Sequence, residues 1–346
     1  MALFHITPDQ WADGIQNARQ TYRLAGPVKN DRFYEFAFLT DDQVPDMTYD
    51  TTRLSPKQIV FPRSEVMFEF HTDTTADDAH VLKETLPDDS PVAVVGIRPC
   101  DMQGILMLKQ NFDTPDIKDT YFQRRFDACT FIGLAVNTPQ PSDFSTSCGT
   151  GPFDETGLDI LLVDCSDYFL AKVLTDNGTE WMKTAGLSQK ADANAEKKIS
   201  KMKQTAEKAI TSTINTDNIQ NSDILTLHGA DFWEEIAFGC INCGACTYAC
   251  PTCWCFDIQD ETFGKKGVRI RNWDTCMAGL YSVHASGHNP RGKDWERTRQ
   301  RFMHKLKYFP EKYDGQLMCV GCGRCITQCP AGIDIRHVAE KMNAVK

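Results

Sequence analysis

The chain has 346 residues and a formal net charge of −10 at neutral pH. This length is too great for one ordinary hydrophobic core, so two domains are expected, and the acidic balance argues against a protein that binds a nucleic-acid backbone. No apolar run is long enough to span a membrane, and the N-terminal residues lack the basic and apolar regions of a secretory signal, so we expect a cytoplasmic protein.

The first domain, residues 1–188, is predicted to be α+β or α/β and to dock a partner protein. Its first helix should begin at Thr7, with Pro8 in the first turn and Gln10 completing a capping box. An apolar strand, PVAVVGI, leads into Arg98–Asp101 and a helix over residues 102–112. Other strand-like runs lie at residues 34–39, 58–62, 66–70, 129–136 and 158–163.

Residues 189–223 are predicted to connect the two domains. They contain an amphipathic, charged helix over residues 190–210 and then the polar segment TSTINTDNIQNSD. The second domain, residues 224–346, is expected to be helical, because little of it alternates as a strand would. Its predicted helices lie around residues 277–284, 295–306 and 335–345, and Asp334 should cap the last of them.

Cysteine usage gives the strongest chemical signal. Fifteen cysteines are present, and eleven of them follow residue 239. An odd number cannot be paired wholly into disulfides. Clustered cysteines in a chain without an export signal are typical of metal ligands.

The motif C-x2-C-x2-C-x3-C-P occurs twice, as CINCGACTYACP at residues 240–251 and as CVGCGRCITQCP at residues 319–330. This run is typical of two-cluster 4Fe–4S ferredoxins, in which the fourth cysteine of each run binds the other cluster. Structural zinc sites instead use two C-x2-C pairs. Gly244 and Gly323 are small enough to let backbone N–H groups approach cluster sulfurs.

We therefore predict two 4Fe–4S clusters with eight cysteine ligands. The first set of ligands is Cys240, Cys243, Cys246 and Cys329. The second set is Cys319, Cys322, Cys325 and Cys250. Each set takes three thiolates from one motif and one from the other, so the two motifs should form one structural unit.

Three further cysteines, Cys253, Cys255 and Cys276, lie between the motifs. One interpretation is a third metal site, completed by His284 or His288. The other is that they are buried thiols that pack as small apolar groups. Three loosely spaced thiols fall short of a closed tetrahedral set, which favours packing.

Several longer segments resemble one protein family. They are CPTCWCFD, VRIRNWDTCM and HASGHNPRGKDWERTRQRFMHK in the spacer between the motifs, and KQIVFPRSEVMFEF, VVGIRPCDMQGI and SCGTGPFDETGLDILLVD in the first domain. The family comprises the 4Fe–4S dicluster electron-transfer subunits of anaerobic sulfite reductases and the β subunits of cytoplasmic sulfhydrogenases. Related members accompany flavin oxidoreductases coupled to heterodisulfide reductase. The long spacer also resembles that of the α-helical ferredoxin domain.

The resemblance implies a non-catalytic electron-relay subunit of a hetero-oligomer that takes part in anaerobic metabolism. It would pass single electrons between a partner that binds FAD and NAD(P)H and a terminal reductase or hydrogenase, and no catalytic residue is assigned. The chain contains neither G-x-G-x-x-G nor G-x4-G-K-[ST], so we expect it to bind no FAD, NAD or ATP itself. Two alternatives stay open: an oxidoreductase whose first domain binds its own substrate, and an adaptor with structural clusters.

The sequence departs from the family pattern at one place. The family pattern has extra cysteines in a C-x-C context before S-x-G-T-G-P, where this chain has Asp143 and Ser145, with Asn137 upstream. Cys100 and Cys148 remain. If relatives bind a third cluster there, this chain is expected to have lost it.

Two groups of polar residues have alternative interpretations. The spacer arginines form a solvated face, or else they lie near the thiolates as cations or form a docking surface. They are Arg269, Arg271, Arg291, Arg297, Arg299 and Arg301. Arg98–Asp101 is either a ligand site at a strand end or a buried turn, and the turn is favoured because no Gly-rich loop accompanies it. His284, His288 and His304 are expected to be structural.

Overall fold

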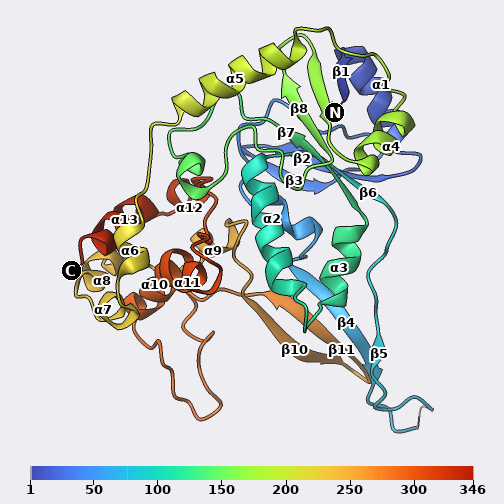
Figure 1. The fold of residues 1–346 in the computed structure, drawn as a ribbon. Coiled ribbons are helices and arrows are strands. Elements are labelled where there is room, and N and C mark those ends of the chain that lie inside the picture. Colours follow the sequence, from blue (N-terminus) through green and yellow to red (C-terminus); the bar gives the residue numbers. More distant parts are fainter. Residues whose placement is uncertain (1, 76, 346) are drawn as a thin grey trace.

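The computed structural model describes residues 2–75 and 77–345. Its first half is built on a seven-stranded sheet with the order β1-β9-β8-β7-β6-β2-β3, in which β2, β6, β7 and β8 are parallel (Figure 1). The strands are β1 (Ala2–Ile6), β2 (Arg23–Asn30), β3 (Phe33–Phe38), β6 (Val92–Ile97), β7 (Cys129–Leu134), β8 (Ile160–Asp164) and β9 (Phe169–Val173). The predicted mixture of helices and strands in this half is confirmed.

Helices cover both faces of the sheet. On one face, α1 (Pro8–Ala18) and α4 (Asp176–Thr184) bury Trp11 and Trp181. On the other face lie α2 (Pro99–Phe112), α3 (Thr120–Asp127) and α5 (Ala195–Ala209). Because β6 and β7 are parallel neighbours, the turn after β6 and the segment after β7 emerge at the same sheet edge.

Most of the local predictions for this half are confirmed. The capping box of α1 is present: Gln10 N donates to Thr7 Oγ1 at 3.3 Å, and Thr7 N donates to Gln10 Oε1 at 2.9 Å. The strand predicted over residues 58–62 is wrong. Pro56–Ile59 form a 3-10 turn, η1, because Pro56 fixes its own φ, and the apolar run that follows is buried as a packed turn.

A second sheet joins the two halves of the chain. It has the order β10-β11-β4-β5, in which β4 (Ser64–His71) and β5 (Lys83–Glu84) come from the first half. The hairpin of β10 (Phe256–Phe263) and β11 (Lys266–Trp273) comes from the spacer between the cysteine motifs, and β11 pairs antiparallel with β4. The expectation that this spacer is helical is therefore wrong over the hairpin.

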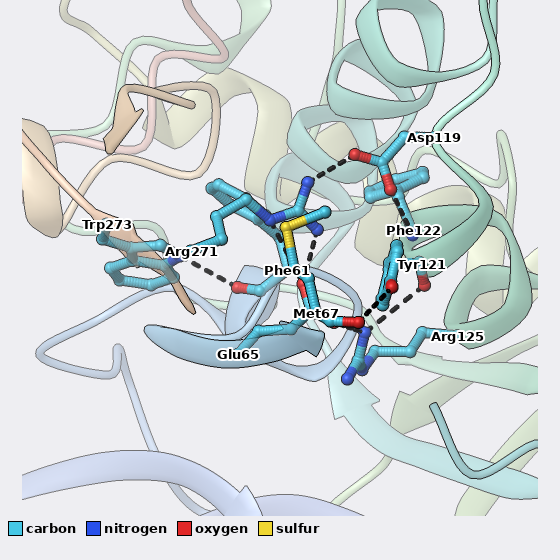
Figure 2. A network of polar contacts seen from close by, with 9 residues as sticks. All are labelled: Phe61, Glu65, Met67, Asp119, Tyr121, Phe122, Arg125, Arg271 and Trp273. Carbon is cyan, nitrogen blue, oxygen red and sulfur yellow. Dashed lines mark hydrogen bonds and ion pairs between the residues drawn. The ribbon is translucent and has the colours of Figure 1, made fainter. Parts of the chain in front are cut away.

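A buried ionic network fixes the hairpin to the first half (Figure 2). Arg271 of β11 donates through Nε and Nη2 to Glu65 of β4, at 3.1 and 2.5 Å, and Nη1 pairs with Asp119 at the start of α3. Both the Arg271 and Glu65 side chains are 2% exposed. Arg125 also pairs with Glu65. The charges in this network compensate one another, as buried charges must.

The rest of the second half is helical and surrounds its own core. Its helices are α6 (Asp217–Asn221), α7 (Ile224–His228), α8 (Phe232–Ala237), α9 (Ala245–Tyr248), α10 (Asp294–Met303), α11 (Phe309–Lys312), α12 (Arg324–Thr327) and α13 (Ile335–Asn343), with a π-helical turn, η3 (His304–Tyr308), after α10. Trp233, Phe302 and Val338 are among the core residues. In α13, Asp334 caps as predicted, because its Oδ1 accepts from Arg336 N at 2.8 Å.

The helix predicted around residues 277–284 is wrong. Residues 274–293 form a series of turns, and Leu280 is 85% exposed. The apolar spacing of residues 277–284 resembles a helix face, but Gly279 interrupts it, and Gly287 and Pro290 follow shortly after. In the described residues, no helix has the length and apolar character needed to cross a membrane. The domain ranges 1–188, 189–223 and 224–346 stay predictions, with the hairpin as a structural link between them.

Candidate iron–sulfur centres

The two cysteine loops have the same backbone geometry. Asn242 and Gly321 occupy equivalent positions in the two motifs, and their φ angles are 53° and 67°. Gly244 and Gly323 are equivalent too, with φ angles of 74° and 72°, and each precedes a single helical turn, α9 or α12. The internal repeat seen in the sequence is therefore also a structural repeat.

This geometry fits an anionic cluster. Left-handed residues followed by a right-handed turn direct successive backbone N–H groups to one side of the chain, forming a concavity that binds anions and is found at many iron–sulfur sites. The two left-handed residues of each loop lie on either side of a predicted ligand, Cys243 in the first loop and Cys322 in the second. The donors of each loop are thiolates, which iron–sulfur clusters require.

The first set of thiols lines one cavity. Cys240, Cys243, Cys246 and Cys329 all border it, together with Cys325 of the second set. Burial raises the pKa of Cys246 above its ordinary value, and the neighbouring Cys240 and Cys329 thiolates add to the rise. Cys243 is exposed, so this cavity lies at the molecular surface.

The second set is more deeply placed. Burial raises the pKa of Cys325 to about 11, and Cys319 and Cys250 contribute. Burial also raises the pKa of Cys322, again with a contribution from Cys250. Cys250, from the first motif, therefore lies among the three thiols of the second motif, as the crossover prediction requires. Assignment of the eight cysteines to two clusters stays a prediction that this arrangement supports.

Lys305 and Arg301 are two of the buried cations that face these thiols. Lys305 Nζ, at the start of η3, lies 3.2 Å from Cys250 Sγ. Arg301, one turn earlier on α10, borders the cavity of the first set. Burial acts to lower the pKa of each cation, but thiolates outweigh it and hold both pKa values above their ordinary range.

Asp101 binds the second loop directly. Arg324, between Cys322 and Cys325, donates to both carboxylate oxygens of Asp101 at 2.5 and 2.7 Å. Its Nε also donates to the carbonyl oxygen of Thr52 at 2.9 Å. Arg98, at the other end of the turn, donates to the carbonyl of Ala135 at 2.9 Å. The Arg98–Asp101 turn is buried and anchors the second loop, in agreement with the favoured interpretation.

The segment after β7 packs on the same loop. Phe144 N donates to the carbonyl of Gly321 at 2.9 Å, so the positions of Asp143 and Ser145 adjoin the second set. A hydrogen bond from Cys148 lowers the pKa of Cys319 to about 7. The two cysteines that remain in these segments, Cys100 and Cys148, thus lie beside the second set. Loss of a third cluster here stays a prediction.

Comparisons with known proteins agree with this geometry. Residues 239–333 match the family model described as a 4Fe–4S dicluster domain. Over its full length the chain is similar to sulfhydrogenase 2 subunit beta of Pyrococcus furiosus: 27% of 345 residues are identical, covering 99% of this chain and 98% of the relative. Both comparisons support the resemblance of the chain to sulfhydrogenase β and related 4Fe–4S subunits. No solved structure gives a significant match.

A separate cavity is lined by the three remaining spacer cysteines, Cys253, Cys255 and Cys276, together with Arg301, His304 and Lys305. A hydrogen bond from Cys276 lowers the pKa of Cys255 to about 6. His284 and His288, the suggested fourth ligands, are exposed and are not among the residues that line this cavity. Within residues 2–75 and 77–345, no three His, Cys, Asp or Glu side chains are grouped as around one metal ion. A third site stays an untested prediction.

Most of the spacer arginines do not form a solvated face. Arg271 is held in the ionic network, and Arg297 and Arg299 are buried against backbone carbonyls. Arg269 matches the solvated interpretation, in an exposed pair with Asp260, and Arg291 is half-buried. Arg301 is the one that faces the cluster thiols.

Sequence reasoning missed Arg324 and Lys305 as residues of the site, and it did not connect Asp101 with the cysteine loops. Asp101 and Arg324 lie within motifs that the sequence makes conspicuous, but no pattern indicates that they pair. The sequence contains only a weak indication of the role of Lys305. Lys305 and Arg301 are four positions apart, so they lie on one helix face, and both are buried. Buried cations without an acidic partner in sequence indicate an anion elsewhere in the fold.

Proposed function

We propose that this iron–sulfur electron-transfer subunit holds two 4Fe–4S clusters and relays single electrons within a multi-subunit oxidoreductase. Its partners would be a protein that binds FAD and NAD(P)H and a terminal reductase or hydrogenase. The observation that carries the proposal is the doubled cysteine loop, with equivalent left-handed residues in both copies and Cys250 lying among the thiols of the second copy.

When bound, a 4Fe–4S cluster takes up and releases one electron. The chain supplies the rest of what a relay needs. Eight thiolates would hold the two clusters, and backbone N–H groups of the loops would donate toward the cluster sulfurs. Burial and nearby charges would set the reduction potential of each cluster. Because the two loops pack together through α9 and α12, both clusters would belong to one rigid unit.

The surface around the first cavity suits contact with a redox partner. Cys243 is exposed, and the flanking apolar side chains Phe238 and Ile241 are 94% and 69% exposed. Ile241 also borders the cavity. Exposed large apolar side chains beside a cofactor are typical of interaction sites. We infer that one partner exchanges electrons through this face.

The terminal partner is proposed by analogy with the relative. Because that protein is named as part of a sulfhydrogenase, a hydrogenase is our first candidate for the terminal partner. A sulfite reductase or a heterodisulfide reductase is the second candidate. An adaptor with structural clusters, or a chain with its own substrate, is an outcome that the test below distinguishes.

The test uses the complex purified through this chain. Cys243→Ser and Cys322→Ser each change one predicted ligand, one in each set, and Cys165→Ser changes a cysteine outside both sets. We expect both ligand variants to stop electron transfer to the terminal acceptor while reduction of the partner flavin by NAD(P)H continues. Cys165→Ser should transfer electrons normally. Unchanged overall turnover in both ligand variants would contradict a relay, and activity of the isolated chain with artificial donors would favour an enzyme.

A further inference from the structure

Arg301 and Lys305 form a buried cationic pair with no acidic partner. They lie four residues apart on α10 and η3, and their exposed fractions are 3% and 2%. Among the described residues, neither has a carboxylate oxygen within 4.0 Å, whereas other buried cations such as Arg271 and Arg324 do. Burying an unpaired charge is strongly unfavourable, so an anion must face this pair.

The polar contacts of Lys305 point to the second set of thiols. Its Nζ lies 3.2 Å from Cys250 Sγ and donates to Thr252 Oγ1 at 2.8 Å and to the Met318 carbonyl at 3.1 Å. Met318 immediately precedes Cys319, another thiol of the second set. Lys305 is not among the residues that line the cavity of the first set.

Arg301 lies between the two sets. It borders the cavity of the first set, which Cys325 of the second set also lines, and its Nη2 donates to the Cys246 carbonyl at 3.3 Å. Its Nε is buried and has no partner among the described residues. A buried N–H without a partner, beside a cavity lined by thiols, can donate a hydrogen bond to an anionic group bound in that cavity.

We propose that Lys305 raises the reduction potential of the cluster held by the second set, and that Arg301 raises both potentials, so the second cluster is the stronger electron acceptor. The inference rests on the proposed function. Each reduction adds one negative charge to a cluster, and a fixed cation nearby stabilises the reduced form. Within this pair, both cations act on the second set and only Arg301 acts on the first, so we expect electrons that enter at the exposed first cluster to pass to the second.

The test is a redox titration of the intact chain, followed by electron paramagnetic resonance of the reduced clusters. Lys305→Met removes one charge, and Arg301→Gln removes the other. Lys307→Met is the matched control, because Lys307 is equally buried on η3 but donates to the Gln220 carbonyl at 2.9 Å and lies near Glu311. Cys322→Ser, which alters the second set alone, assigns the two potentials.

We expect Lys305→Met to lower the higher potential and leave the lower one in place. Arg301→Gln should lower both, and Lys307→Met should change neither. Lys305→Arg keeps the charge and should keep both potentials. The inference is overturned if Lys305→Met retains its iron with unchanged potentials, or if Lys305→Arg shifts them as far as Lys305→Met does.

Two further outcomes are informative. If Lys305→Met does not retain both clusters, Arg301→Gln still decides, since an unchanged pair of potentials there overturns the inference. A wild-type chain that contains no iron contradicts the proposed function instead, so the two failures are distinguishable.

Discussion

Arg324 and Asp101, which are 223 positions apart in the sequence, form a buried, bidentate ion pair. Arg324 is the first residue of α12, directly after Gly323 of the second cysteine loop, and Asp101 lies in the first turn of α2, directly after β6. The pair joins the cluster-binding half of the chain to the α/β half at the edge where β6 and β7 end. Together with the Arg271–Glu65 pair, it indicates that the two halves form one interlocked structure.

The first prediction concerns this ion pair. Asp101→Asn leaves the Arg324 guanidinium buried without its counter-charge, which costs about 3–5 kcal/mol of unfolding free energy. Anaerobic urea unfolding of the purified chain measures the loss. The double variant Asp101→Leu, Arg324→Met removes both charges and should recover part of it. A loss below about 1 kcal/mol in Asp101→Asn, the range of exposed pairs, would show that the pair is not buried.

The second prediction compares two arginines on β11. Arg271→Met leaves Glu65 with only Arg125 as a cation, and we expect a loss of about 3–5 kcal/mol of unfolding free energy. Arg269→Met, two positions away, breaks an exposed pair with Asp260 and should cost at most about 1 kcal/mol. The difference between the two urea midpoints is the measurement. Equal midpoints would mean that the hairpin does not dock through Arg271.

The third prediction concerns Gly323 in the second loop. An added Cβ would overlap Ser142 Oγ and lie 2.6 Å from the Ser142 carbonyl oxygen. Gly323→Ala should therefore displace the segment after β7 and cost about half of the bound iron, or about four atoms per chain.

Gly264→Ala is the control for this variant. Gly264 has a similar φ of +62°, but an added Cβ would meet open space. The Gly264→Ala variant therefore has the backbone strain of a left-handed alanine, about 1–2 kcal/mol, without a steric clash. We expect its iron content to match the wild type. Full iron in Gly323→Ala would show that the close contact with Ser142 is not needed for the site.

The fourth prediction separates the predicted ligands from the neighbouring thiols. Cys250→Ser should remove one cluster, or about four irons, because Cys250 is the predicted fourth ligand of the second set. Cys253→Ser, three positions later, should keep the wild-type iron content if Cys253 only packs as a small apolar group. Metal analysis of both variants decides. A third cluster would appear as about twelve irons in the wild type and as a loss in Cys253→Ser.

The sequence was sufficient to predict those parts whose chemistry is local. The caps at Thr7 and Asp334 and the buried strands β6 and β7 each depend on residues within a few positions of one another. The spacing of the thiols indicates the cofactor because three ligands must reach one cluster from one loop.

The sequence was misleading where a distant part of the chain completes the structure. The β10–β11 hairpin was missed because β10 is exposed and polar, and because a charged residue, Arg271, occupies the buried face of β11. An arginine in that place is acceptable only beside Glu65 and Asp119, which no local pattern reveals. The same holds for Lys305, whose role depends on a thiol 55 positions earlier.

The most direct measurement is the metal and sulfide content of the anaerobically purified chain, together with its visible spectrum. About eight irons and about eight acid-labile sulfides per chain are predicted, with broad absorption in the visible range that bleaches on reduction. A colourless chain that contains zinc and no labile sulfide would contradict the assignment of two 4Fe–4S clusters to these eight cysteines.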